Sequence, residues 1–205
     1  MILGRITSLE ELRALYPPAH ERALKKQLSY IDPHCRRFIE LSPFLVISSK
    51  GQDGLADASP RGDQPGFVRI VDETTLTIPD WPGNNRLDTL SNIIADPAVG
   101  LLFLIPGVDD VLRVNGEAEL RTDEELRAPF ARSGKLPRLV INMTVREAYL
   151  HCPKALMRAK LWDPSVRIER SQLPSLLEMI HDQIKSTEPA ESQADMVARL
   201  KQVLY

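Results

Sequence analysis

The sequence contains few cysteines and no long hydrophobic run, and both absences exclude classes of protein. Its two cysteines, Cys35 and Cys152, are too few for the disulfide framework of a small secreted domain, which indicates a reducing compartment. The longest apolar run, VGLLFLIP at positions 99–106, is far shorter than the roughly 20 residues that a membrane helix requires. The N-terminal stretch MILGRITSLEELRALY becomes charged too early for a signal peptide. We therefore expect a cytoplasmic protein without a membrane span.

An excess of positive charge is also missing. The chain has 26 Lys and Arg residues against 28 Asp and Glu residues, a formal net charge of −2. No broad positive field is available to hold nucleic acid or an anionic membrane, so an anion would have to be bound locally. With 205 residues, 43% of them hydrophobic, the chain can build one core with a helical appendage rather than two independent domains.

Several known site motifs are absent as well. The sequence has neither G-x-G-x-x-G nor G-x-x-x-x-G-K-[ST], which argues against a dinucleotide fold and a P-loop. It has no G-x-S-x-G nucleophile elbow. Two His-Cys pairs, at positions 34–35 and 151–152, superficially suggest zinc. Adjacent residues rarely reach one metal ion together, and neither pair has C-x-x-C or H-x₃-H spacing, so we expect no metal site.

Helical patterns flank a central region of short strands. Residues 8–41 predict three helices, of which the first begins with a capping box at Ser8 and the last with Asp32-Pro33. Residues 56–66 are expected to form a loop with a turn at Arg61-Gly-Asp63. Further helices are expected at residues 86–95, 123–132, 153–161, 173–185 and 190–203. The strand candidates are Phe44–Ser49, Phe67–Val71, Thr74–Ile78, Val99–Ile105, Val111–Leu120 and Leu139–Tyr149.

The hydrophobic pattern of these strands predicts the fold class. Val111–Leu120 and Leu139–Val145 show a period of two residues, which is typical of strands with one buried face. Val99–Ile105 is apolar on both faces, as expected for a strand that is covered on both sides. Because strands and helices do not alternate regularly, we predict a mainly β, α+β fold, an antiparallel barrel with a few inserted helices.

The segment WPGNNRLDTL, at positions 81–90, suggests an anion site. If Asn85 caps the following helix, Arg86 is its first residue and Asp88 its third, so free N–H groups of the first turn lie beside a guanidinium. Gly83 lets the backbone approach closely, and Arg86 offers a forked donor to phosphate oxygens. The alternative is an ordinary strand-to-helix turn with a solvated arginine, because Asn and Gly are common turn residues. The negative charge of Asp88 favours this alternative.

A second cationic segment, HCPKALMRAKLW, lies at positions 151–162. In a helix that begins at Pro153, Lys154 and Arg158 share one face, and like charges at this spacing cost roughly 0.2–0.5 kcal/mol unless an anion lies between them. Trp162, one turn beyond Arg158, could cover an apolar ring. The alternative is a solvated basic face with Trp162 in the core, and these residues alone favour that alternative.

The order of these elements resembles the FMN-binding split barrel of the pyridoxine/pyridoxamine 5'-phosphate oxidase superfamily, in its branch of predicted flavin-nucleotide-binding proteins. The resemblance spans residues 40–165 and rests on GFVRIVDETTLTIPD, GNNRLDTLSNIIADPAVGLLFLIPG, VLRVNGEAEL and the late HCPKALMRAKLW segment. It implies an antiparallel split β-barrel domain at residues 42–165. A helical segment, residues 1–41, would precede it, and C-terminal helices, residues 166–205, would pack on the barrel.

The resemblance also implies residues that contact FMN. Those lining the flavin ring or ribityl chain would be Val68, Arg69, Ile70, Ile78, Pro79 and Asp80, with Ser59 and Arg61 closing over the ring. Those holding the phosphate would be Asn84, Asn85 and Arg86. The second subunit of a homodimer, with FMN at the interface, would contribute Lys154, Arg158 and Trp162.

We therefore expect an FMN-dependent oxidoreductase with an unknown substrate, in which the flavin supplies the chemistry and no catalytic side chain can be named. Where the oxidases carry a Ser-Arg-Lys phosphate turn, this chain has Asn-Asn-Arg, and it lacks their Arg-Leu-x-Pro terminus, so vitamin B6 oxidation is not implied. One alternative is a flavin carrier or sensor without turnover. Another is a haem-handling protein on the same barrel, with His151 or His181 as axial ligand.

Overall fold

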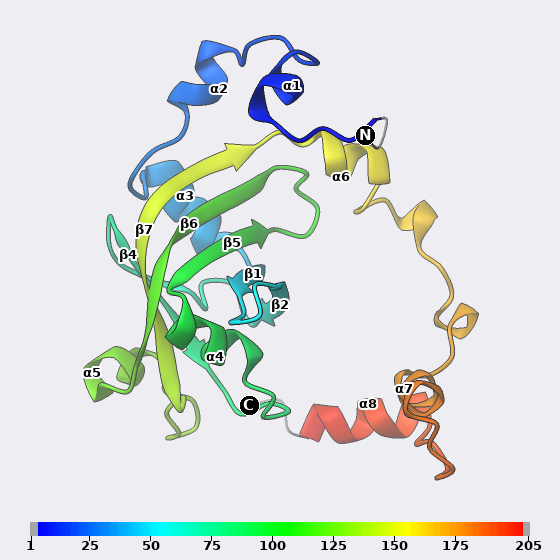
Figure 1. Ribbon diagram of the computed structural model, residues 1–205. Helices are drawn as coiled ribbons and strands as arrows, with labels where there is room; N and C mark the ends of the chain where they lie inside the picture. Colours follow the sequence, from blue (N-terminus) through cyan, green and yellow to red (C-terminus); the bar gives the residue numbers. More distant parts are fainter. Residues whose placement is uncertain (1–3, 203–205) are drawn as a thin grey trace. The chain divides into compact units, whose positions relative to one another are not determined.

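A computed structural model describes residues 4–202 of the chain (Figure 1). The chain divides into two compact units, one that ends at Ala159 and one that begins at Lys160. No helix in the described range is long and apolar enough to cross a membrane.

The first unit begins with three short helices. The helices α1 (Leu9–Arg13) and α2 (Glu21–Lys25) bury none of their residues, whereas α3 (Pro33–Leu41) packs on the sheet. The Asp32 carboxylate caps α3 by accepting a hydrogen bond of 2.7 Å from the Cys35 N–H, as the Asp-Pro start predicts. The residues that α3 contributes to the core are Cys35, Phe38 and Ile39.

A single curved sheet of seven strands forms the body of this unit (Figure 1). All neighbouring strands are antiparallel, in the order β2-β1-β5-β6-β7-β4-β3, and the sheet is not closed. The predicted α+β class and antiparallel split barrel are confirmed. The strands are β1 (Phe44–Lys50), β2 (Ala56–Gly62), β3 (Arg69–Asp72), β4 (Thr75–Asp80), β5 (Ala98–Leu104), β6 (Val111–Arg121) and β7 (Leu139–His151).

The strand β2 corrects the expectation of a loop at residues 56–66. Its sequence, ADASPRG, has no apolar alternation and contains Pro60, which suits an edge strand that pairs on one side, here with β1. The period of two residues is present in the burial, because the half-buried positions are the polar residues Asp57, Ser59 and Arg61. A strand whose inward face is polar has no hydrophobic signature in the sequence.

The strand β5 was expected to be covered on both faces. Val99, Leu101 and Phe103 lie in the core, but Leu102, on the opposite face, is 36% exposed. Within one chain, β5 is therefore covered on one side.

The helix α4 (Asp88–Ala95) joins three parts of the unit. It packs on β1, β2 and β6, and its buried Asn92 amide donates hydrogen bonds to Ser49 Oγ (3.0 Å) and Asp57 Oδ2 (2.7 Å). This network fixes α4 against the β2 edge of the sheet. The remaining helices of the unit are α5 (Glu124–Arg127), the 3₁₀ turn η1 (Ala128–Phe130) and α6 (Lys154–Ala159).

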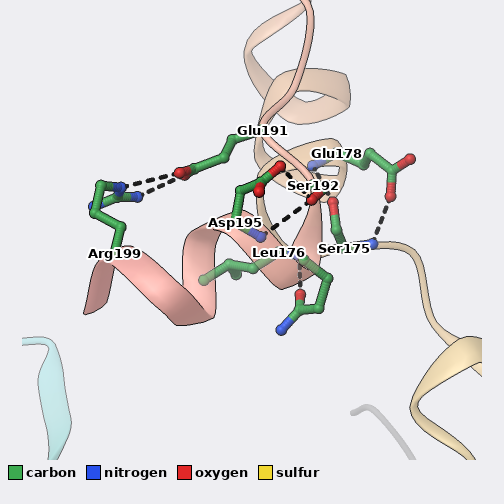
Figure 2. A network of polar contacts seen from close by, with 8 residues as sticks. Ser175, Leu176, Glu178, Glu191, Ser192, Asp195 and Arg199 are labelled. Atoms are coloured by element: carbon green, nitrogen blue, oxygen red, sulfur yellow. Dashed lines mark hydrogen bonds and ion pairs between the residues drawn. The ribbon is translucent and has the colours of Figure 1, made fainter. Parts of the chain in front are cut away.

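The second unit contains η2 (Pro164–Val166), η3 (Arg170–Gln172), α7 (Leu176–Ile184) and α8 (Gln193–Gln202). Polar contacts hold its helix ends together (Figure 2): Ser175 and Glu178 form a capping box on α7, and Glu191 pairs with Arg199 at 2.7 Å. The Gln193 side-chain oxygen accepts hydrogen bonds from Arg170 and from the Leu176 N–H. The expected end of the last helix, residue 203, lies outside the described residues.

The register of β6 against β7 shifts between Asn115 and Gly116, where a β-bulge forms. A Cβ atom on Gly116 would lie 2.0 Å from the backbone oxygen of Thr144 on β7. Glycine is therefore required at this position for the two longest strands to pair.

We expect Gly116→Ala to destabilise the protein by about 3 kcal/mol, because the clash is with backbone that cannot rotate away. Thermal unfolding followed by circular dichroism should show a Tm lowered by roughly 6–12 °C. Gly83→Ala is the matched control, since a Cβ there meets no atom within 4 Å. Equal melting temperatures for the two variants would contradict the role of Gly116.

Candidate functional site

The two edges of the open sheet approach each other through side chains. On the β2 side, Ser59 Oγ accepts a hydrogen bond of 3.1 Å from the Thr89 hydroxyl in the first turn of α4. The Arg61 guanidinium lies close enough to Asp80, at the end of β4, to oppose in part the rise in pKa that burial causes in that carboxyl. We call the space between β2 and the ends of β3 and β4 the seam.

An ion pair borders the seam on a third side. Asp63, which follows β2, pairs with Arg132, which follows η1, at 2.6 Å, and the two side chains are 10% and 33% exposed. Because Asp63 is nearly buried, removing Arg132 would leave a desolvated charge, which costs more free energy than the loss of a surface pair. The ion pair fixes residues 129–132 beside the segment that connects β2 to β3.

A pocket of about 190 Å³ lies beside this ion pair. It joins two residues expected to contact flavin, Arg69 and Pro79, with aromatic side chains that the sequence did not single out. Because residues 129–132 are distant in the chain, only the fold reveals that they belong here. The pocket is lined by Gln64, Pro65, Gly66, Phe67, Arg69, Pro79, Trp81, Pro129, Phe130, Ala131 and Arg132.

The strands β3 and β4 present backbone rather than side chains at several expected positions. Val68 and Ile78 are 4% and 0% exposed and lie in the core, against which Ile70 also packs. Their side chains are not free to contact a ligand. The strand β3 is the last of the sheet, so the backbone groups of its outer edge are available to an external acceptor or donor.

The Asp80 carboxyl is half-buried beside two cations. Burial raises its pKa above the ordinary value, and Arg61 and Arg138 oppose this rise in part. The Arg138 N–H donates to the Asp80 carbonyl oxygen at 3.1 Å. The pair formed by Asp80 and Arg61 thus puts opposite charges on the two sides of the seam.

The turn before α4 differs from the expected one. The helix begins at Asp88, its N-cap is Leu87 at φ 61°, and Asn85 also has a positive φ, 59°. Asn84 rather than Asn85 turns back, accepting a hydrogen bond of 3.1 Å from the Arg86 N–H. The expectation of Asn85 as the helix cap and Arg86 as the first helical residue is therefore wrong, because two left-handed residues delay the helix.

The start of α4 has no side-chain cap within the described residues. Its first-turn N–H groups carry the positive end of the helix dipole. The Arg86 Nε donates to Asp88 Oδ2 at 2.9 Å, with 73% of the arginine side chain exposed. Surface pairs of this kind contribute little stability, so Arg86 can exchange Asp88 for a stronger anion at small cost.

The second cationic segment forms the helix α6 and the residues that follow it. Lys154 and Arg158 are exposed on α6, which ends at Ala159 because Lys160 takes a left-handed conformation, φ 49°. The helix was expected to continue to residue 161, so Trp162 is not on its next turn. Trp162 belongs to the second unit.

Groups of three or more His, Cys, Asp or Glu side chains that could hold a metal ion are absent from residues 4–202. The two candidate haem ligands differ in their surroundings, since His151 Nε2 is buried without a hydrogen-bond partner among the described residues. The His151 ring packs on Tyr149, with ring centroids 5.0 Å apart, and burial and nearby Arg113 and Lys26 lower its pKa. His181 Nδ1 lies 3.0 Å from the Glu188 carbonyl oxygen.

The raised pKa of Asp80 predicts a pH-dependent cost. When the folded pKa lies above the unfolded value, the ionised form is destabilising, and stability increases as the pH falls through the folded pKa. We expect Asp80→Asn to raise the Tm at pH 7. The gain should disappear below the ordinary aspartate pKa of 3.8, where the carboxyl is protonated in both states. Melting curves between pH 3 and 8 test this, and a Tm gain that is constant across the range would refute it.

Comparison with known proteins gives a family. A family model described as pyridoxamine 5'-phosphate oxidase matches residues 31–152. Among solved structures, a histidine-to-alanine variant of HupZ from Group A Streptococcus is similar, with 16% identity over 59% of this chain and 99% of that chain and a TM-score of 0.50. A candidate pyridoxamine 5'-phosphate oxidase from Lactobacillus delbrueckii has 17% identity over 60% and 98% of the two chains, and a TM-score of 0.46.

No curated protein matches the chain. At these identities the HupZ structure shows a shared fold alone. The family model, in contrast, covers more than half of the chain, including all seven strands and α4. The chain therefore belongs to the pyridoxamine 5'-phosphate oxidase family.

Proposed function

We propose that the protein binds FMN in the seam and acts as an FMN-dependent oxidoreductase. The observation that carries the proposal is convergence. Ser59 on β2, which was expected to contact flavin, bonds to the first turn of α4, Arg61 lies near Asp80 on β4, and Arg69 and Pro79 line one pocket. The family match, which covers the same elements, supports it.

Each part of the seam suits a different part of FMN. The uncapped N–H groups of α4 and the Arg86 guanidinium favour the phosphate, since both are hydrogen-bond donors that attract an anion. The outer edge of β3, with Arg69, offers an extended surface for the ring system, and Pro79 on β4 lines the adjoining pocket. Ser59 and Arg61, on β2, would close the opposite side.

The flavin, when bound, supplies two-electron redox chemistry. The chain's own contribution is to anchor the phosphate, orient the ring and exclude water from one ring face. The pocket beside Arg69 and Trp81 would then admit a substrate to the ring, and its three aromatic residues favour an apolar or aromatic group there.

A homodimer is part of this proposal. The outer face of the sheet exposes Phe44 and Leu102, at 38% and 36%, on the neighbouring strands β1 and β5. A second copy would cover this face, in agreement with the apolar pattern of Val99–Ile105. Lys154 and Arg158 of α6 would then be supplied to the partner's flavin phosphate, where their like charges would be compensated.

The first test is the absorption spectrum of the purified protein. We expect flavin bands near 375 and 450 nm, with one FMN per chain and two chains per particle by light scattering. Bleaching by NADPH followed by reoxidation with a substrate would identify an enzyme. A stable flavin without turnover would leave the carrier or sensor alternative, and a Soret band without flavin would replace the proposal by haem binding.

The second test concerns the phosphate. We expect Arg86→Ala to weaken FMN binding by about 1.5–3 kcal/mol, or about tenfold or more, the scale of a charge-assisted hydrogen bond. Asp88→Asn should tighten binding about threefold, because Asp88 competes for Arg86 and repels the phosphate. Fluorescence titration of the flavin-free protein with FMN measures both effects.

Arg146→Ala is the matched control for this series. Arg146 is another exposed arginine paired with a carboxylate, Glu117, at 2.6 Å, but it lies on β7. Its loss should leave the FMN dissociation constant unchanged. If Arg86→Ala behaves like Arg146→Ala, the phosphate is not held at the start of α4.

A further inference from the structure

A larger pocket, of about 960 Å³, lies between the N-terminal helices and the end of β7. Apolar side chains and one aromatic ring form part of its wall, and charged side chains of α2 form its rim. We call it the α2 pocket. It is lined by His20, Glu21, Arg22, Ala23, Lys26, Leu28, Asp32, Cys35, Tyr149 and Leu150.

The segment that covers this pocket is fixed to the sheet. Leu28 exchanges two backbone hydrogen bonds with Ala148 on β7, at 3.0 and 2.8 Å. The Lys26 ammonium donates to the Leu150 carbonyl oxygen at 2.6 Å, and the Gln27 amide donates to Glu147. The pocket wall is thus built by pairing along β7 rather than by a loose terminal segment.

The lining of the α2 pocket carries two carboxylates, Glu21 and Asp32, and two cations, Arg22 and Lys26. Glu21 is paired with Lys25 at 2.5 Å, and the Asp32 carboxylate caps α3 through the Cys35 N–H. Within residues 4–202, Arg22 forms no ion pair, and Lys26 donates to an uncharged carbonyl. Each carboxylate of the lining thus has a donor of its own, whereas Arg22 and Lys26 form no ion pair within residues 4–202.

The Lys26 ammonium also lies over an aromatic ring, 5.2 Å from the centroid of Tyr149. This contact, together with the bond to Leu150, holds the ammonium at the pocket wall with two N–H donors left over. Beside it, Leu28, Ala23 and Leu150 offer apolar surface. The pocket thus combines a fixed cation with an apolar floor.

We propose that the α2 pocket is a second ligand site, which binds a small aromatic acid. The acidic group would pair with Lys26 and Arg22, and the ring would lie against Tyr149, Leu28 and Leu150. An organic cation is disfavoured, since the carboxylates of Glu21 and Asp32 already have donors, whereas Arg22 and Lys26 have no anionic partner in the described residues. A neutral aromatic molecule would not form the charge-assisted hydrogen bonds with Lys26 and Arg22 that would orient the ligand.

We propose only reversible binding at this site, without a chemical reaction. Cys35 is the nucleophilic side chain of the pocket, but burial, with help from Asp32, raises the pKa of its thiol to about 12. At neutral pH it is a neutral, inert thiol. No covalent step is therefore invoked.

The inference does not rest on the proposed flavin function. The α2 pocket lies at the Tyr149 end of β7, whereas the seam lies at the other end, where Leu139 pairs with Asp80. The two ends are roughly 35 Å apart along the strand. Within one chain the two sites are therefore separate.

Calorimetric titration of the full chain with 2-naphthoate tests the proposal. We expect saturable binding with a dissociation constant on the order of 0.1–1 mM. 2-Naphthalenemethanol, which has the same ring without the charge, should bind at least about tenfold more weakly. Arg22→Gln and Lys26→Gln should each weaken naphthoate binding about five- to tenfold.

Arg13→Gln is the matched control, because Arg13 is an exposed cation of the neighbouring helix α1 that does not line the pocket. It should leave naphthoate binding unchanged. Ala23→Trp, which fills the pocket without changing any charge, should abolish binding. The FMN content of every variant should equal that of the parent protein, which separates this test from that of the seam.

Three outcomes would overturn the proposal. They are the absence of saturable binding, an equal loss in Arg13→Gln, and competition between naphthoate and FMN for one site. The last would place the acid in the seam instead.

Discussion

The structure depends on a sheet that curves until its two edges meet without pairing. A closed barrel would satisfy every backbone donor and acceptor by a neighbouring strand. Here β2 and β3 remain edges, and side chains join the β2 edge to other elements: Ser59 bonds to Thr89 on α4, Arg61 lies near Asp80 on β4, and Asp63 pairs with Arg132 at 2.6 Å. Side-chain contacts leave space that backbone pairing would remove. That space is the seam in which we place the flavin.

The energetically unfavourable features of this arrangement lie around the seam. Asp80 is held half-buried, with a raised pKa, and the turn before α4 contains two non-glycine residues with positive φ. Such conformations persist where the surrounding structure determines them, often at ligand sites. The Asn92 network, which fixes α4 against β1 and β2, provides that support. The first-turn N–H groups of α4 are thereby held in position before a ligand arrives.

Much of the fold could be predicted from local patterns. Leu112, Val114, Ala118 and Leu120 place one face of β6 in or against the core, as their period of two residues requires. The strand β2 could not be predicted, because its inward residues are polar. Phe130 and Arg132 could not be assigned to the site, since nothing in their local sequence distinguishes them from other loop residues. The delayed start of α4 depended on left-handed residues for which Asn85 gives a weak signal and Leu87 none.

The sequence by itself determined the antiparallel α+β class, the strands with apolar faces and the family, because hydrophobic periodicity and motif order are properties of neighbouring residues. Only the tertiary structure decided which polar residues converge, and it did so through strand order. With β2 and β3 at opposite edges, curvature brings Arg61 to Asp80 and residues 129–132 to Arg69. The same pairing along β7 brings Lys26 to Tyr149, more than a hundred residues away. Contacts of this kind arise from packing between distant segments, which no local pattern encodes.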